Sequence, residues 1–111
     1  MTTDELFNAL GDHGTHIMLD ETGCSLRVRG GRPSSGLLAE VKAHKLELVA
    51  ALQEARDLAR DLVREGDVEA FAAEFSAATR RGTLSITDRY AAGLALTLAR
   101  RWQGAAEENA A

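Results

Sequence analysis

Apolar residues recur along the chain with two different spacings, and each spacing predicts one type of element. Leu6, Phe7 and Leu10 lie three or four residues apart, which predicts a short helix within the first thirteen residues. Over residues 15–29 the apolar positions alternate with polar ones, and the turn-forming residues 20–23 lie between the two alternating runs. This part of the chain therefore predicts two short strands paired as an antiparallel β-hairpin.

Helical spacing returns after a loop at residues 30–36 that is rich in Gly and Ser and contains the single Pro. Apolar residues then follow at three- and four-residue steps over 37–62, which predicts one long helix or two helices with a bend. Two more helical patterns cover about 67–81 and 86–104. The predicted fold class is α+β and mainly helical, in the order short helix, β-hairpin, long helix and two further helices.

Length and composition fit one small domain with an extension. The 111 residues are 45% hydrophobic and 27% charged, which is the balance of a folded globular protein. We expect a helix-hairpin-helix domain at 1–54, a helical extension at 55–104 and a flexible, Ala-rich tail at 105–111.

Charge and hydropathy exclude several classes of partner. The formal net charge of −4 provides no global positive field, so nucleic acid is not the expected partner. No apolar run approaches the roughly 20 residues that a membrane span requires, and the first residues lack the basic start and apolar stretch of a secretory signal. We therefore expect a cytoplasmic protein that does not bind a membrane.

The chemistry-bearing side chains do not form a recognisable catalytic or metal site. His13, His16, His44 and Cys24 are the only imidazole and thiol groups, and no two of them have the close spacing of structural zinc ligands. Cys24 is expected on the second strand, buried as a small hydrophobic residue and facing away from His16. Carboxylates beside Arg on the helices predict solvated faces. We expect no catalytic residue, no metal and no cofactor, and thus not an enzyme.

The outer face of the hairpin is the first candidate for binding. Because alternate side chains of a strand point to opposite faces, Ile17 and Val28 should point inward and Arg27 and Arg29 outward. The two guanidinium groups would lie about 7 Å apart, suited to acidic side chains of an extended peptide that adds to a free strand edge. Alternatively, edge arginines only keep the strand soluble. The expected partner-binding residues are His16, Met18, Arg27, Arg29 and Arg32.

The apolar seam of the long helix is the second candidate. We expect two copies of the chain to bury this seam against each other as a homodimer, because a hairpin and one helix have little core of their own. The alternative is that the same side chains pack within one chain. The residues expected at such a dimer interface are Val41, Lys45, Leu48, Leu52 and Leu62.

Residues 3–54 also resemble a known family. The motifs that carry the resemblance are a glycine before the first strand, the strand Leu26-Arg27-Val28-Arg29, a Gly/Pro loop and the helix segment His44-Lys45-x-Glu47-Leu48. In these motifs and their order the chain resembles the TubC-type docking domain found at the N-terminus of some nonribosomal peptide and polyketide synthase subunits. The resemblance implies a small, often dimeric helix-hairpin-helix domain that captures a short acidic C-terminal tail. The remaining matching residues are Gly14, Ile17, Leu19, Gly30, Pro33, Leu37, Val41 and Leu52.

The sequence thus predicts a non-catalytic docking or adaptor module that captures an acidic or extended segment of another protein on its hairpin face. The alternative is a nucleic-acid-associated accessory protein of a mobile element, a replication system or a defence system. The arginines that this alternative would use are Arg27, Arg29, Arg32, Arg80, Arg81, Arg100 and Arg101.

Overall fold

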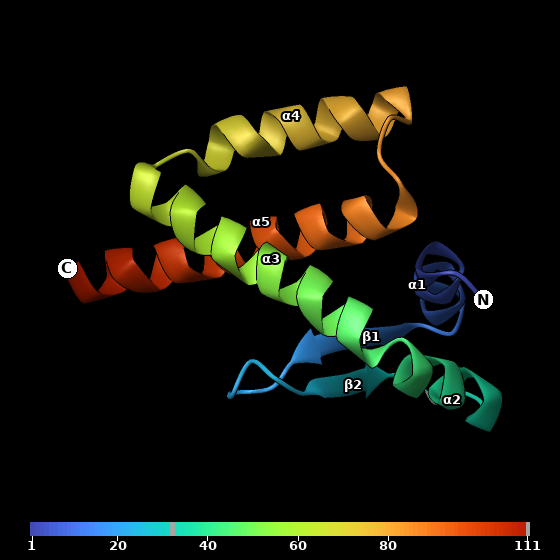
Figure 1. Cartoon of the computed structure of the whole chain (residues 1–111). Helices are drawn as coiled ribbons and strands as arrows, with labels where there is room; N and C mark the ends of the chain where they lie inside the picture. The colour runs from blue at the N-terminus through green and yellow to red at the C-terminus, as the bar shows by residue number, and fades with distance from the viewer. Residues whose placement is uncertain (32, 111) are drawn as a thin grey trace. The chain divides into compact units, whose positions relative to one another are not determined.

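The computed structural model describes residues 1–31 and 33–110, with side chains as far as Ala105. Helices and strands follow in the predicted order, so the α+β, mainly helical class is confirmed (Figure 1). The chain divides into two compact units, an N-terminal unit of residues 1–53 and a C-terminal unit of residues 54–111. The elements are α1 (Thr3–Asp12), β1 (Thr15–Leu19), β2 (Leu26–Gly30), α2 (Ser35–Ala43), α3 (Lys45–Glu65), α4 (Val68–Arg81) and α5 (Ile86–Ala110).

A reciprocal capping box starts α1. The Thr2 hydroxyl accepts a hydrogen bond from the amide of Glu5 at 3.1 Å, and the Thr2 amide donates to the Glu5 carboxylate at 3.2 Å. These bonds use two of the amides that a helix start otherwise leaves without partners. The helix buries Leu6, Phe7 and Leu10, so its predicted apolar stripe is the side that packs.

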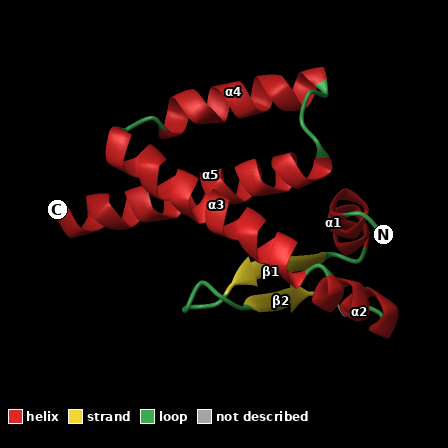
Figure 2. Ribbon diagram, in the orientation of Figure 1, coloured by secondary structure: helices red, strands yellow, loops and turns green. Residues whose placement is uncertain are grey.

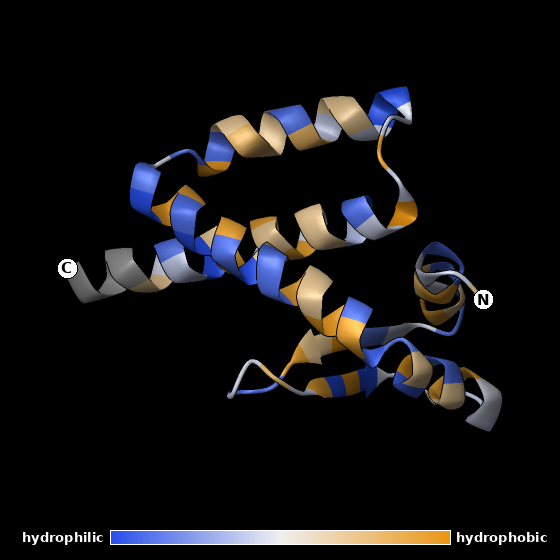
Figure 3. Ribbon diagram, viewed as in Figure 1, coloured by the Kyte–Doolittle hydropathy of each residue, from blue (hydrophilic) through white to orange (hydrophobic). Residues whose placement is uncertain are grey.

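The predicted hairpin is a two-stranded antiparallel sheet (Figure 2). Residues pair from Thr15 with Gly30 to Leu19 with Leu26. The alternating pattern places Ile17 in the core, where it is 1% exposed. In Figure 3 hydrophilic and hydrophobic residues alternate along β2, which is the period-two pattern of a strand with two different faces.

The long helical pattern forms two helices, which is the second of the two alternatives open at the sequence level. His44 separates α2 from α3 and has φ −100° and ψ 14°. Its amide still donates to the carbonyl of Glu40 at 3.0 Å, and its carbonyl accepts from the amide of Leu48 at 2.9 Å. Hydrogen bonding thus continues through the bend, and apolar positions at helical spacing occur on both sides of it, so periodicity alone does not decide between one helix and two.

The core of the N-terminal unit joins these helices and the first strand. Leu6, Leu10, Ile17, Leu48 and Leu52 are each at most 2% exposed. Burying one such side chain contributes roughly 1.5–3 kcal/mol to stability. The core is therefore assembled from α1, β1 and the first half of α3, and α2 adds Leu37 and Val41, each 6% exposed.

Two adjacent glycines allow β2 to leave the sheet beside the turn that follows α1. A Cβ atom placed on Gly30 would lie 2.3 Å from the carbonyl oxygen of Gly14, and one on Gly31 would lie 2.1 Å from that of His13. Gly30 also has a φ of +93°, a conformation that residues with a side chain rarely adopt. The close approach of two backbone segments thus requires glycine at these positions.

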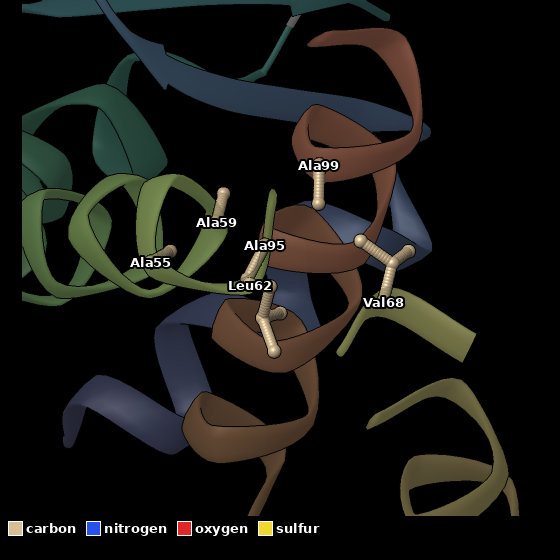
Figure 4. Packing of buried hydrophobic residues seen from close by; sticks show 6 residues of the cluster. All are labelled: Ala55, Ala59, Leu62, Val68, Ala95 and Ala99. Atoms are coloured by element: carbon tan, nitrogen blue, oxygen red, sulfur yellow. The ribbon is translucent and has the colours of Figure 1, made fainter. Parts of the chain in front are cut away.

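The C-terminal unit contains the second half of α3 together with α4 and α5. Its core consists mainly of small side chains, which let helices approach closely, and Figure 4 shows them converging from the three helices. Phe71 is half-buried against this core, and its ring stacks on that of Phe75 with ring centroids 6.5 Å apart. The six buried residues are Ala55, Ala59, Leu62, Val68, Ala95 and Ala99.

The ends of the last two helices agree only in part with the sequence prediction. α4 covers Val68–Arg81 and ends at Gly82, whose φ of 68° is the left-handed conformation common after a helix. α5 reaches Ala110 and so continues beyond the end predicted near residue 104. Residues 105–108 are Ala-Ala-Glu-Glu. Alanine and glutamate are strong helix formers, which explains why the helix continues past the predicted end although this segment is polar. Among the described residues, none of the helices combines the length and the hydropathy that crossing a membrane requires.

Candidate functional site

Four of the five predicted partner-binding residues share one face of the hairpin. The register pairs His16 with Arg29 and Met18 with Arg27 across the two strands. His16, Arg27 and Arg29 are exposed and Met18 is half-buried. These four residues are called the docking face below, and the fifth, Arg32, lies outside the described residues.

The opposite face of β2 is only partly buried. Val28 pairs with the buried Ile17 and lies on the inward face as predicted, and it is 40% exposed. Of the two strands, α1 packs mainly against β1. Burial therefore decreases from the first strand to the second, and β2 is the outer strand of the hairpin.

The outer edge of β2 carries backbone groups that point away from β1. The amide of Gly31 donates to the carbonyl of Gly14 at 3.1 Å, and the amide of Asp20 donates to the carbonyl of Ser25 at 2.9 Å. Since hydrogen-bonded pairs alternate along an antiparallel ladder, the amides and carbonyls of residues 26, 28 and 30 face outward. In the described part of the chain no third strand joins the sheet, so this edge is open to another strand.

The two arginines of the docking face form no ion pair with another described residue. Within residues 1–31 and 33–105, no carboxylate lies within ion-pair distance of Arg27 or Arg29. Arginines elsewhere do form such pairs, as Arg60 with Asp57 at 3.8 Å, Arg64 with Asp61 at 2.9 Å and Arg100 with Glu69 at 3.7 Å. The guanidinium groups of the hairpin are thus available to an acidic ligand.

The turn between the strands is held by one carboxylate. Asp20 Oδ1 accepts hydrogen bonds from the hydroxyl and amide of Thr22, at 2.7 and 3.1 Å, and from the amides of Gly23 and Ser25. These bonds, above all that from the Thr22 hydroxyl, hold the pKa of Asp20 below its ordinary value. An Asp at the start of a turn is a sequence signal for hydrogen bonds from its side chain to the turn amides. From the sequence, Asp20 was predicted only to lie in the turn.

Cys24 lies in this turn and not on the second strand. β2 begins only at Leu26, and the thiol of Cys24 is exposed, so the prediction of a buried, inward-facing cysteine is wrong. The physical reason is that the hydrogen bonds to Asp20 keep residues up to Ser25 in the turn. Among the described residues no group of three or more His, Cys, Asp or Glu side chains is arranged to hold a metal ion.

The residues expected at a helical dimer interface are mostly buried within the single chain. Packing inside one chain, the alternative to the homodimer, accounts for their apolar spacing, and the buried members offer almost no surface to a second copy. Lys45 is exposed at the start of α3, and its neighbour Leu46, which the sequence analysis did not single out, is 86% exposed. The buried members are Val41, Leu48, Leu52 and Leu62, each at most 7% exposed.

The His44-to-Leu48 segment that carries part of the family resemblance joins three helices. Nδ1 of His44 lies 3.2 Å from a carboxylate oxygen of Glu47, and Nε2 of the same ring lies 3.6 Å from a carboxylate oxygen of Glu40. Glu47 also accepts a hydrogen bond from the hydroxyl of Thr3 in α1. The hydrogen bond from Thr3 is the main cause that lowers the pKa of Glu47, and the one with His44 lowers it further. These side chains therefore support the fold beneath the hairpin and do not belong to the docking face.

The arginines of the nucleic-acid alternative are distributed over both units. Arg80 and Arg81 lie in the last turn of α4, and Arg100 and Arg101 lie on α5, where Arg100 is paired with Glu69. Arg27 and Arg29 belong to the N-terminal unit. In the sequence, these C-terminal arginines occur as two adjacent pairs, Arg80-Arg81 on α4 and Arg100-Arg101 on α5.

No protein-family model matches the chain, and comparison with curated proteins and with solved structures likewise gives no match. Function is therefore inferred from the docking face and the open edge beside it.

Proposed function

We propose that the N-terminal unit is a non-catalytic docking module that captures an extended, acidic segment of another protein on its hairpin. The observation that carries this proposal is the combination of an open outer edge on β2 with two exposed arginines that have no ion-pair partner among the described residues. An edge strand with charged side chains is protected from random pairing, yet it still accepts a strand whose charges are complementary.

The captured segment adds as a third strand beside β2. Its backbone bonds to the outward amides and carbonyls of residues 26, 28 and 30, which supplies affinity without regard to sequence. Its side chains alternate between the two faces, so carboxylates two residues apart meet Arg27 and Arg29. The specificity is therefore for acidic residues at alternate positions of an extended peptide.

The family resemblance supports the same mode of binding. The strand Leu26-Arg27-Val28-Arg29, which carries much of the resemblance to TubC-type docking domains, is the strand with the open edge. TubC-type domains capture short acidic tails of partner subunits in biosynthetic assembly lines. We accordingly propose a protein partner with an acidic, extended terminal segment, either in such an assembly line or in another complex that this chain serves as an adaptor.

Charge reversal tests the proposal directly. The wild-type chain is titrated by calorimetry with a decapeptide that alternates glutamate and threonine, since threonine favours strands and the glutamates supply the carboxylates. The double variant Arg27→Glu/Arg29→Glu should lose at least tenfold in affinity, because each carboxylate would then meet a like charge. Circular dichroism checks that the variant remains folded, as expected for two exposed positions.

A matched charge reversal provides the control. Arg80→Glu/Arg81→Glu makes the same change in net charge at two exposed, adjacent positions of the C-terminal unit and should leave the peptide affinity unchanged. A peptide with glutamine in place of glutamate should bind no better than the reversed variant. Equal binding by the wild type and the Arg27→Glu/Arg29→Glu variant would exclude the docking face, and salt-dependent retention on duplex DNA would favour the nucleic-acid alternative instead.

A further inference from the structure

We propose that Val28 is a second determinant of the captured segment: it selects an apolar side chain at the position between the two carboxylates that meet Arg27 and Arg29. This inference rests on the proposed docking function and names the class of peptide that the hairpin takes. The core of that peptide is an extended acidic–apolar–acidic tripeptide.

Val28 lies between the two arginines on β2 and points to the opposite face of the sheet. It pairs with the buried Ile17 of β1, which places its side chain on the inward face. Figure 3 shows the alternation of hydrophilic and hydrophobic residues along this strand. Because the amide and carbonyl of Val28 face away from β1, a third strand hydrogen-bonds to Val28 itself. Val28 is therefore at the centre of the proposed contact.

The side chain of Val28 is only partly covered by the rest of the chain. It is 40% exposed, whereas Ile17 directly across the hairpin is 1% exposed. Leu26, two residues earlier on the same face, is half-buried. Since α1 packs mainly against β1, the edge strand keeps a strip of apolar surface in contact with water.

Strand geometry decides which side chain of the captured segment reaches Val28. Neighbouring strands lie about 4.8 Å apart, and side chains opposite each other point to the same face of the sheet. The two residues that meet Arg27 and Arg29 are two positions apart, so the residue between them lies beside Val28 on the inward face. An apolar side chain at this position removes its own surface and that of Val28 from water, whereas a polar one does not.

The experiment exchanges threonine and valine, which are both β-branched and favour strands but differ in polarity. The probe is the glutamate–threonine decapeptide with one central threonine replaced by valine, and calorimetry compares it with the parent peptide. The wild type should bind the valine peptide about two- to fivefold more tightly, the range for one cross-strand apolar pair. Val28→Thr should bind both peptides equally, and Val28→Ile should keep the preference for valine.

Two matched controls separate this pairing from a general gain in hydrophobicity. A peptide in which the central valine and the neighbouring glutamate exchange places has the same composition but no longer alternates, and it should bind no more tightly than the parent peptide. Val63→Thr makes the same substitution at a half-buried valine of the C-terminal unit and should keep the wild-type preference. Circular dichroism checks that each variant remains folded.

The outcomes separate this inference from the docking function. If affinity depends on Arg27 and Arg29 but the wild type binds the valine and threonine peptides equally, docking stands and the role of Val28 is excluded. An undiminished preference for valine in Val28→Thr also excludes it. If neither peptide binds, or if reversal of the two arginines has no effect, the docking function itself fails and this inference fails with it.

Discussion

The side-chain amide of Gln53 in α3 donates a hydrogen bond to the backbone carbonyl of Gly23 in the hairpin turn, at a distance of 2.8 Å. Thirty residues separate these two groups along the chain. The bond fastens the tip of the hairpin to the helix that supports it, while the other end of the hairpin is held by the close approach of Gly31 to His13. The docking face is thereby held at both ends.

The first prediction concerns this tie. Gln53→Ala should lower the free energy of unfolding by about 1 kcal/mol, the usual contribution of one hydrogen bond, and should leave the carbonyl of Gly23 to solvent. The amides of residues 22–25 should exchange with deuterium faster than in the wild type, whereas those of α4 should not change. Urea denaturation and hydrogen exchange measure the two effects. Equal exchange rates of the turn amides in the wild type and in Gln53→Ala would show that the hydrogen bonds of Asp20 alone hold the tip of the hairpin.

The second prediction concerns pH and the turn carboxylate. The folded-state pKa of Asp20 is lowered by its hydrogen bonds, so the ionised group stabilises the fold at pH values above its unfolded pKa of about 3.9. This stabilisation is lost as the pH falls through the lower, folded-state pKa. Asp20→Asn removes the charge, so the difference in stability between wild type and variant should shrink as the pH is lowered from 5 towards 2.

Glu21→Gln is the control for Asp20→Asn. Glu21 is the exposed neighbour in the same turn, and no hydrogen bond to the turn amides depends on it. Its replacement should leave the acid branch of the stability curve unchanged, as followed by thermal unfolding at successive pH values. A similar effect of both variants would indicate a general charge effect and not the hydrogen bonds of Asp20.

The elements were predictable because each rests on a local signal. The helical spacing of Leu6, Phe7 and Leu10 predicted α1, and the alternation of apolar and polar residues predicted both strands. The four described residues of the docking face share one surface for the same reason, since strand alternation decides the face of every side chain.

The parts that sequence reasoning missed depend on contacts between distant residues. The position of Cys24 depends on hydrogen bonds to Asp20, and the exposure of Val28 depends on how α1 packs on the hairpin, mainly against β1. The tie from Gln53 to Gly23 has no sequence signal, since a glutamine on a helix is ordinarily a solvated residue.

The third prediction tests the backbone approach at the base of the hairpin. Gly31→Ala places a methyl group where the carbonyl oxygen of His13 lies, and backbone must move to admit it. The cost should be about 2 kcal/mol or more, typical of overpacking against a rigid partner. Gly36→Ala is the control, because its added methyl would meet only the Ser34 hydroxyl at 4.0 Å and alanine favours the helix. Thermal unfolding should show a lower melting temperature for the first variant only.

The last prediction separates a core leucine from an exposed one on the same helix. Leu48 is fully buried and Leu46 is 86% exposed, although only one residue lies between them. Leu48→Ala should cost about 2–5 kcal/mol because it removes buried apolar surface and leaves a cavity, whereas Leu46→Ala should change stability by no more than about 0.5 kcal/mol. Denaturant titration gives both values, and light scattering gives the mass of each variant. A drop in mass for Leu48→Ala, with the fold retained, would instead place Leu48 between two copies of the chain, contrary to its burial within one.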